Sequence, residues 1–247
     1  MNHNFAIIMA GGLGSRFWPT STSHKPKQFL DVLNTGETLL QQTFRRVSLT
    51  IPKKNILIVT KSDYLNFCLD QLPEINKENI ICEPLRRNTA PCIALAAFKL
   101  KKIDPLANFI VTPADHLVTN ESEFKRIIQL GLSVTAENNI LLTLGISPNK
   151  PETGYGYIQF KKEENSFNTE IKAVKTFTEK PELELAKSFL ETGEFLWNSG
   201  IFIWNANSIL SAFEKHMPEM YSLFEDGWGD IDSDNEKAFL ETIILFP

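Results

Sequence analysis

The sequence predicts an α/β fold, a doubly wound, mainly parallel sheet that is flanked by helices. Two observations support this prediction. Short apolar runs recur up to about residue 144, and apolarity is continuous within each run, as in strands that are covered on both faces. Stretches with apolar residues spaced by three and four separate the runs, which is typical of helices. In such sheets, ligands bind beyond the carboxyl ends of the strands.

The individual elements follow from this pattern. The expected strands are residues 5–10, 55–60, 79–82, 108–112 and 140–144, and the expected helices are residues 38–47, 88–100 and 121–132. After about residue 150, apolar and polar residues alternate more, which indicates mixed or antiparallel additions. These are residues 155–160 and 171–178, with a polar hairpin tip at 163–169, a further strand at 195–204 and two or three helices after it.

The chain is expected to form one compact domain over residues 1–247, because no repeat or linker interrupts it. Its last residues, 241–247, are mostly apolar. Such residues normally pack against something further along the chain, so we expect the sequence to be cut short at the C-terminus.

Composition excludes several classes of protein. The 247 residues include 25 basic and 30 acidic ones, a formal net charge of −5, so the basic excess of a nucleic-acid-binding domain is missing. No apolar run of about 18 residues predicts a membrane span, and the N-terminus does not resemble a signal peptide. The three cysteines form no CxxC pair, which favours buried thiols in a reducing cytoplasm.

A glycine-rich segment, Ala10-Gly11-Gly12-Leu13-Gly14-Ser15-Arg16, follows the first expected strand. Glycines let backbone N–H groups surround a phosphate. The dinucleotide fingerprint is excluded because Phe17 stands where its last glycine belongs, and the Walker loop because Lys27 is too far from Gly14. A long loop with Arg16 and Lys27 suits a triphosphate. The alternative is a plain strand-to-helix turn.

These residues, together with Pro19 and the segment Pro26-Lys27-Gln28-Phe29, resemble the signature of nucleotidyltransferases that make sugar nucleotides. Four further segments resemble mannose-1-phosphate guanylyltransferases in particular, and they occur in the order of that family. They are Glu83-Pro84 through Arg87-Asn88-Thr89-Ala90-Pro91, Pro113-Ala114-Asp115-His116, residues 151–158, and residues 177–181 followed by Trp197-Asn198-Ser199-Gly200.

The resemblance implies a fold of the nucleotide-diphospho-sugar transferase type and a reaction between GTP and mannose 1-phosphate that gives GDP-mannose and pyrophosphate. Such a product serves polysaccharide biosynthesis. The sugar phosphate attacks the α-phosphorus of the nucleotide, so catalysis consists mainly of alignment and charge neutralisation, and no nucleophilic side chain is required. Oligomeric state stays open, and a homo-oligomer is compatible with the sequence.

The resemblance also implies a role for each candidate residue. Arg16 and Lys27 neutralise phosphates, and Asp115 holds Mg²⁺. The nucleotide-binding residues are Ala10, Gly11, Gly12, Gly14, Ser15, Glu83, Pro84, Arg87, Asn88 and Thr89. The sugar-binding residues are Gly154, Tyr155, Glu179 and Asn198.

Each role has a plainer alternative. Arg16 and Lys27 could be ordinary surface cations, and Gly154 a hairpin turn. Asp115 could cap the next helix, as Asn88 and Thr89 could cap theirs. His116 is either a positioning residue or a bystander, and Trp197 and Trp204 are expected in the core.

One departure from the family puts activity in doubt. A second metal-binding aspartate of the family lies in a Trp-x-Asp-x-Gly segment, whereas Trp228-Gly229-Asp230-Ile231-Asp232 lacks the closing glycine and comes too early. Two alternatives therefore stay open. One is an enzyme for another base and sugar, such as dTTP and glucose 1-phosphate, and the other is a sugar-nucleotide binding module with weak or no catalysis.

Overall fold

The computed structural model describes residues 3–12, 19–22, 24–83, 89–162 and 170–244. The chain divides into two compact units. The first unit comprises Met1–Leu141 with Ile203–Pro247, and the second is Leu142–Phe202. Each unit has strands and helices of its own, and the expectation of a single domain over the whole chain stays a prediction.

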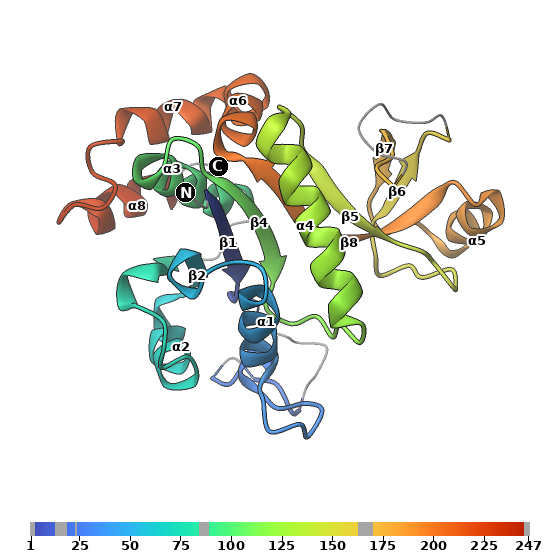
Figure 1. Ribbon diagram of the computed structural model, residues 1–247, viewed down its shortest axis with the longest axis horizontal. Helices are drawn as coiled ribbons and strands as arrows, with labels where there is room; N and C mark the ends of the chain where they lie inside the picture. The colour runs from blue at the N-terminus through green and yellow to red at the C-terminus, as the bar shows by residue number, and fades with distance from the viewer. Residues whose placement is uncertain (1–2, 13–18, 23, 84–88, 163–169, 245–247) are drawn as a thin grey trace. The chain divides into compact units, whose positions relative to one another are not determined.

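A parallel sheet forms the centre of the first unit (Figure 1). Its strands are β1 (Asn4–Met9), β2 (Ile56–Lys61), β3 (Ile80–Glu83) and β4 (Asn108–Pro113), in the order β3-β2-β1-β4. Met9 at the end of β1 pairs with Val59 on one side and with Pro113 on the other. The four carboxyl ends therefore meet at one edge of the sheet, as the sequence predicts.

Helices connect these strands and cover the sheet. They are α1 (Leu39–Ser48), α2 (Leu65–Gln71), α3 (Thr89–Ile103), α4 (Glu121–Glu137), α6 (Ala206–His216), α7 (Pro218–Asp226) and α8 (Glu236–Ile244). Single 3₁₀ turns lie at η2 (Lys27–Phe29), η3 (Lys53–Asn55), η4 (Ser62–Tyr64) and η5 (Lys77–Asn79). The helices α1 and α4 contact each other, and α3, α6 and α7 form a second group. Among the described residues, no helix is long and apolar enough to cross a membrane.

The core of the first unit explains the continuous apolar runs of the strands. Ile7 and Ile8 on β1, Ile58 on β2 and Phe109 on β4 are all fully buried, because helices cover both faces of a doubly wound sheet. The ring of Phe109 meets the buried ring of Trp204 edge to face, with 6.2 Å between centroids. The expectation that Trp204 is a core residue is therefore confirmed.

Three helices of the first unit, α1, α4 and α6, begin at capping side chains that satisfy free backbone N–H groups, and α6 is capped by Asn205. Thr38 forms a reciprocal capping box with Gln41 at the start of α1. Asn120 caps α4, where its side chain accepts a hydrogen bond of 3.0 Å from the N–H of Glu123. The alternative reading, in which Asp115 caps this helix, is therefore wrong, and the Asp115 side chain is left for another role.

The C-terminal helices of the first unit are fixed to α3 by a buried cation. The Lys99 side chain is only 9% exposed, and its Nζ lies 2.6 Å from Asp232 and 2.6 Å from Glu236. The Trp228 ring packs edge-on against Phe98 of α3. The segment around Trp228 that superficially resembles a metal-binding motif thus contributes to packing between helices.

The second unit contains β5 (Leu142–Ile146), β6 (Tyr157–Phe160), β7 (Val174–Thr178), most of β8 (Phe195–Asn205) and α5 (Leu183–Thr192). The strand β6 runs antiparallel to both β7 and β8, and β5 pairs with β8. This arrangement confirms the antiparallel additions that the alternating pattern predicts. The expected hairpin tip at 163–169 lies outside the described residues.

An aromatic cluster forms the core of the second unit. Tyr157, Trp197 and Phe195 are buried together with Ala186 of α5. Phe189 of α5 stacks on Phe195 with 3.8 Å between ring centroids. Trp197 is therefore a core residue, as expected.

The cap of α4 gives a first testable prediction. Asn120→Ala removes the acceptor for the Glu123 N–H and should lower the free energy of unfolding by about 1 kcal/mol, the usual cost of losing a cap. Asn120→Asp keeps an acceptor at the same place and should retain most of the stability. Urea denaturation of both variants measures the difference. Equal losses for the two would show that the capping bond contributes nothing.

Candidate active site

The candidate site of the first unit lies at the carboxyl edge of the parallel sheet. Ala10 to Gly12 follow β1, and Ala114 to His116 follow β4. The N–H of Ala114 donates a hydrogen bond of 3.0 Å to the carbonyl of Met9, which keeps the two chains together beyond the last strand residues. The glycine segment and Asp115 therefore begin side by side.

An ion pair joins two of the predicted catalytic residues. Lys27 Nζ lies 2.5 Å from Asp115 Oδ2, and each side chain is about one quarter exposed, at 23% and 24%. Residues 88 positions apart in the sequence thus meet at the carboxyl edge, where ligands bind in sheets of this kind. A partly desolvated cation and carboxylate are suited to phosphate and to a hard metal ion respectively.

Metal binding here would depend on few protein ligands. Within the ranges that the structure describes, no three histidine, cysteine, aspartate or glutamate side chains gather as a metal centre. A single carboxylate still fits Mg²⁺, because this ion usually keeps several waters and takes one or two carboxylates together with substrate phosphates. Asp115 therefore meets the minimum that a Mg²⁺–nucleotide site needs.

The glycine segment is held by a residue that the sequence analysis did not single out. The buried Gln28 side chain donates from Nε2 to the carbonyl of Ala10 at 2.7 Å and to the carbonyl of Gly12 at 3.0 Å. A Cβ added at Gly11 or at Gly12 would meet no described atom within 4 Å, and neither glycine has a positive φ. Among the described residues, none fills the space beside the Cα atoms of these two glycines.

The turn that carries Asp115 rests on α1. Arg46, which is 2% exposed, donates from Nη2 to the carbonyl of His116 at 3.3 Å and to Thr43 Oγ1 at 3.1 Å. Thr43 in turn lies 3.4 Å from the carbonyl of Ala114. Two neighbouring side chains of one helix therefore support the backbone on both sides of Asp115.

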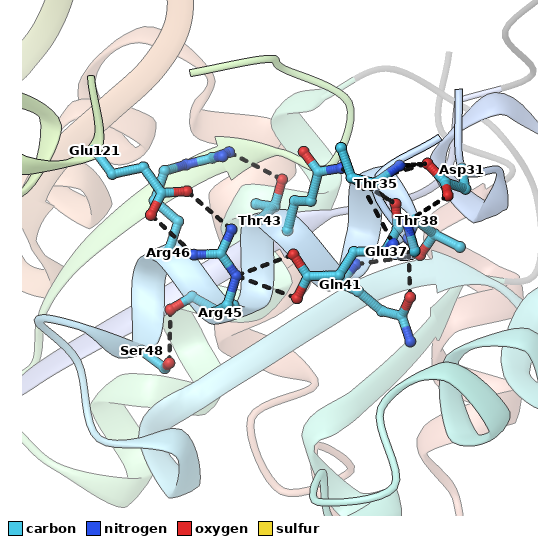
Figure 2. A network of polar contacts seen from close by, with 12 residues as sticks. Asp31, Thr35, Glu37, Thr38, Gln41, Thr43, Arg45, Arg46, Ser48 and Glu121 are labelled. Atoms are coloured by element: carbon cyan, nitrogen blue, oxygen red, sulfur yellow. Dashed lines mark hydrogen bonds and ion pairs between the residues drawn. The ribbon is translucent and has the colours of Figure 1, made fainter. Parts of the chain in front are cut away.

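Arg45, the residue before Arg46 in α1, anchors the other end of the connection between β4 and α4. Figure 2 shows Arg45 between two carboxylates, with Nε 3.1 Å from Glu37 and the two Nη atoms 2.9 and 3.0 Å from Glu121. Glu121 is the first residue of α4. The charge-assisted hydrogen bonds raise the pKa of Arg45, the bond to Glu121 most of all. The β4–α4 connection is thus fixed to α1 at both ends.

Arg46 is an unusual core residue. Its Nε is buried without a hydrogen-bond partner, and no described carboxylate lies within ion-pair distance of it. The guanidinium group lies 5.3 Å from the centroid of the Phe124 ring, a weakly favourable arrangement. Burial lowers the pKa of Arg46. Stability alone does not explain a charge in such a place.

His116 follows Asp115 and is partly buried. Burial lowers the pKa of its imidazole below the ordinary value of 6.5, against the opposing effect of the Asp115 charge. The cations Lys27 and Arg46 lower this pKa further. The ring is therefore mostly neutral at pH 7, and both expected roles of His116, a positioning residue and a bystander, stay open.

The predicted sugar-side residues all belong to the second unit. Glu179 and Asn198 converge on Gly156, because a Cβ at Gly156 would lie 2.7 Å from Glu179 Oε2 and 3.5 Å from Asn198 Cβ. The N–H of Asn198 donates to the Gly156 carbonyl at 2.7 Å. Gly154 and Tyr155 form the bend just before β6, and Tyr155 packs edge-on against Trp197.

Two residues of this cluster were missed by the sequence analysis. Gly156 has the Glu179 carboxylate and Asn198 against it, whereas a Cβ added at Gly154 would meet only the flexible Glu152 carboxylate, at 3.2 Å. Lys180 has a φ of 42° and pairs with Glu179 at 2.7 Å. The Glu179-Lys180-Pro181 tripeptide was the available signal for Lys180, and Gly154-Tyr155-Gly156 was the signal for the second glycine.

Several predicted nucleotide-binding residues lie outside the described ranges. These are Gly14, Ser15 and Arg16 of the glycine segment, and Pro84, Arg87 and Asn88 of the expected base-binding segment. The structure describes the backbone of Glu83, which ends β3, and of Thr89, which begins α3. The described residues on either side of this segment are therefore the last residue of β3, at the carboxyl edge of the sheet, and the first residue of α3.

The support beneath Asp115 gives a second prediction. Arg46→Met removes a buried charge without leaving a charged partner behind, so the free energy of unfolding should stay within about 1 kcal/mol of the original value. The amides of residues 114–117 should nevertheless exchange faster with deuterated water, because the His116 carbonyl loses its donor. Exposed Arg126→Met is the control. Unchanged exchange in Arg46→Met would mean that Arg46 does not hold this turn.

Comparison with known proteins agrees with this arrangement. The nucleotidyl transferase family model matches residues 5–241. A putative mannose-1-phosphate guanylyltransferase of Vibrio cholerae is 41% identical over 217 residues, 87% of this chain and 46% of that protein. Mannose-1-phosphate guanylyltransferase of Escherichia coli is 37% identical over 248 residues, 96% of this chain and 51% of that protein. The chain thus spans about half the length of these curated relatives.

A solved structure resembles the fold closely. The Thermus thermophilus protein named mannose-1-phosphate geranyltransferase superimposes with a TM-score of 0.84 at 28% identity, covering 97% of this chain and 68% of the other. This likeness confirms the predicted fold class. Because the family model covers nearly the whole sequence, the chain belongs to the nucleotidyl transferase family.

Proposed function

We propose that this protein joins GTP and mannose 1-phosphate to give GDP-mannose and pyrophosphate. The reaction type is supported above all by the Lys27–Asp115 pair at the edge where the glycine segment begins. The choice of GTP and mannose is supported by the names of relatives that are 37–41% identical over most of the chain. The five motif segments of the sequence support the same choice.

In this proposal, the first unit binds the triphosphate. Backbone groups from Ala10 to Ser15 surround the phosphates, and Arg16 and Lys27 neutralise them. A phosphate oxygen of the sugar phosphate attacks the α-phosphorus, the bond from that phosphorus to the bridging oxygen of the β-phosphate breaks, and pyrophosphate leaves with the electron pair. The charges of the two cations stabilise the negative charge that gathers on these oxygens.

Asp115 would hold Mg²⁺ together with the nucleotide phosphates, and the bound ion would neutralise phosphate charge. Lys27 forms an ion pair with the Asp115 carboxylate. Binding of a Mg²⁺–nucleotide therefore frees the Lys27 ammonium group for the phosphates. When a Mg²⁺–nucleotide binds, Asp115 can exchange Lys27 for the metal ion while Lys27 exchanges Asp115 for a phosphate.

The sugar belongs to the second unit in this proposal. Glu179 and Asn198 offer acceptors and a donor to adjacent hydroxyl groups of the hexose, and the small Gly156 lets them approach each other. Gly154 and Tyr155 complete the sugar-side loop. Lys180, which pairs with Glu179, adds a cation to this sugar-side cluster.

The base-binding role that we propose for Glu83, Pro84, Arg87, Asn88 and Thr89 rests on the family resemblance and on their place after β3. The enzyme is proposed to act in the reducing cytoplasm. The free state of Cys68, Cys82 and Cys92 supports this location. Burial raises the pKa of Cys68 to about 12, so this thiol stays protonated and inert.

The substrate proposal is tested by pyrophosphate release with every pairing of GTP, ATP, UTP and dTTP with mannose 1-phosphate and glucose 1-phosphate. We expect GTP with mannose 1-phosphate to give the highest kcat/KM, and we expect Mg²⁺ to be required. Faster turnover with dTTP would overturn the substrate assignment and leave the reaction type standing. Stabilisation by GDP-mannose without any turnover would instead identify a sugar-nucleotide binding module.

The role of Arg16 gives a further prediction. Arg16→Ala should lower kcat/KM by ~10²–10³-fold, the scale for removing one donor that stabilises transition-state charge. Arg126→Ala, which removes an exposed arginine on α4, should leave kcat/KM unchanged. A loss of less than about threefold for Arg16→Ala would place Arg16 outside the site.

A further inference from the structure

Gln28 is the buried polar residue whose contacts bear most directly on the glycine segment. It lies in η2, between Lys27 and Phe29, and it is 2% exposed. We propose that Gln28 is a positioning residue that presets the start of the glycine segment for the triphosphate. This inference rests on the proposed function and concerns how Gln28 holds the backbone of the glycine segment.

The Gln28 side chain holds the backbone at two positions of the glycine segment. Both hydrogen bonds of Gln28 Nε2 go to backbone carbonyls that lie beyond the end of β1, those of Ala10 and Gly12. The Ala10 carbonyl also accepts a hydrogen bond of 3.1 Å from the buried Thr60 Oγ1. The Ala10 N–H donates to the Val59 carbonyl at 2.7 Å. Side chains therefore fix the backbone where the strand pairing stops.

Electrostatics explains why these carbonyls matter. A carbonyl oxygen carries a partial negative charge and repels a phosphate, whereas an N–H attracts it. The C=O and the following N–H of a planar trans peptide point in opposite directions. Holding the Ala10 carbonyl therefore also sets the direction of the Gly11 N–H. By accepting the Gln28 hydrogens, the Ala10 and Gly12 carbonyls are kept turned toward the protein.

The same 3₁₀ turn connects the glycine segment to the candidate catalytic cation. Lys27 reaches Asp115 from one side of Gln28. On the other side, the buried Phe29 ring stacks on Phe67 with 5.1 Å between centroids and meets Tyr64 edge-on. The aromatic contacts fix η2 in the core. Because Gln28 ties the glycine segment to η2 and Lys27 belongs to η2, the distance between the glycine segment and the Lys27 backbone is fixed.

A second glutamine of the first unit separates this role from simple stabilisation. Gln42 is 7% exposed and also donates both Nε2 hydrogens, at 3.0 Å to Thr35 Oγ1 and at 3.1 Å to the Glu37 carbonyl. These acceptors belong to the loop before α1 and not to the glycine segment. Gln28 and Gln42 therefore lose comparable bonds on substitution, but only Gln28 affects the proposed phosphate site.

The experiment compares Gln28→Met with Gln42→Met, because methionine keeps the length of the side chain and removes both donors. Melting temperature, GTP binding by calorimetry, and KM for each substrate are measured for the wild type and both variants. We expect similar losses of melting temperature in the two variants. We expect Gln28→Met alone to weaken GTP binding and raise its KM by about tenfold, the scale of two ordinary hydrogen bonds.

Comparing the KM values of the two substrates tests whether Gln28 acts as a positioning residue for the triphosphate. The KM for mannose 1-phosphate at saturating GTP should stay unchanged in Gln28→Met, a split that general destabilisation does not produce. Gln28→His keeps one donor and should recover part of the affinity for GTP. Equal GTP binding by the two methionine variants, with a wild type that binds GTP, would overturn the role of Gln28 and leave the proposed function intact. A wild type that binds no nucleoside triphosphate would overturn both.

Discussion

The parallel pairing of β1 with β4 is the constraint on which the candidate site depends. Six residues pair in unbroken register, from Asn4 with Asn108 to Met9 with Pro113, so both strands end at the same level. The chain leaves each strand at the same edge, and the glycine segment and the Asp115 turn begin as neighbours. Because strand register is fixed by burial on both faces, the separation of these two segments is fixed by the core.

Much of this architecture is legible in the sequence, because it depends on local patterns. Continuous apolar runs identify the strands of the first unit, and spacings of three and four identify α1, α3 and α4. The helices α2 and α5 were not predicted, although α5 ends at Gly193 with a positive φ, a common signal of a helix C-terminus. No side chain caps the N-terminus of either helix, and α2 is only seven residues long. Short helices without caps are held by their surroundings.

The residues that complete the candidate site are harder to predict, because their roles arise between distant segments. Gln28 is recognisable only through carbonyls 16 and 18 positions earlier in the chain. Gly156 is recognisable only through the Glu179 carboxylate that lies against it. Arg46 looks like an ordinary helical arginine until its burial beneath the Asp115 turn is seen. Sequence motifs predict where a site lies, whereas the residues that hold its backbone in place can be identified only from the tertiary structure.

The Lys27–Asp115 ion pair has a consequence for which ions the protein attracts from solution. Opposite charges 2.5 Å apart cancel each other at a distance, so this pair offers little long-range pull on free inorganic phosphate or on a lone metal ion. Either of them alone would have to break the pair and leave one partner unmatched. A Mg²⁺–nucleotide complex carries both positive and negative charge, so it can pair with the lysine and with the carboxylate at the same time. Within the proposed function, the ion pair therefore favours binding of a metal-loaded nucleotide over binding of either part alone.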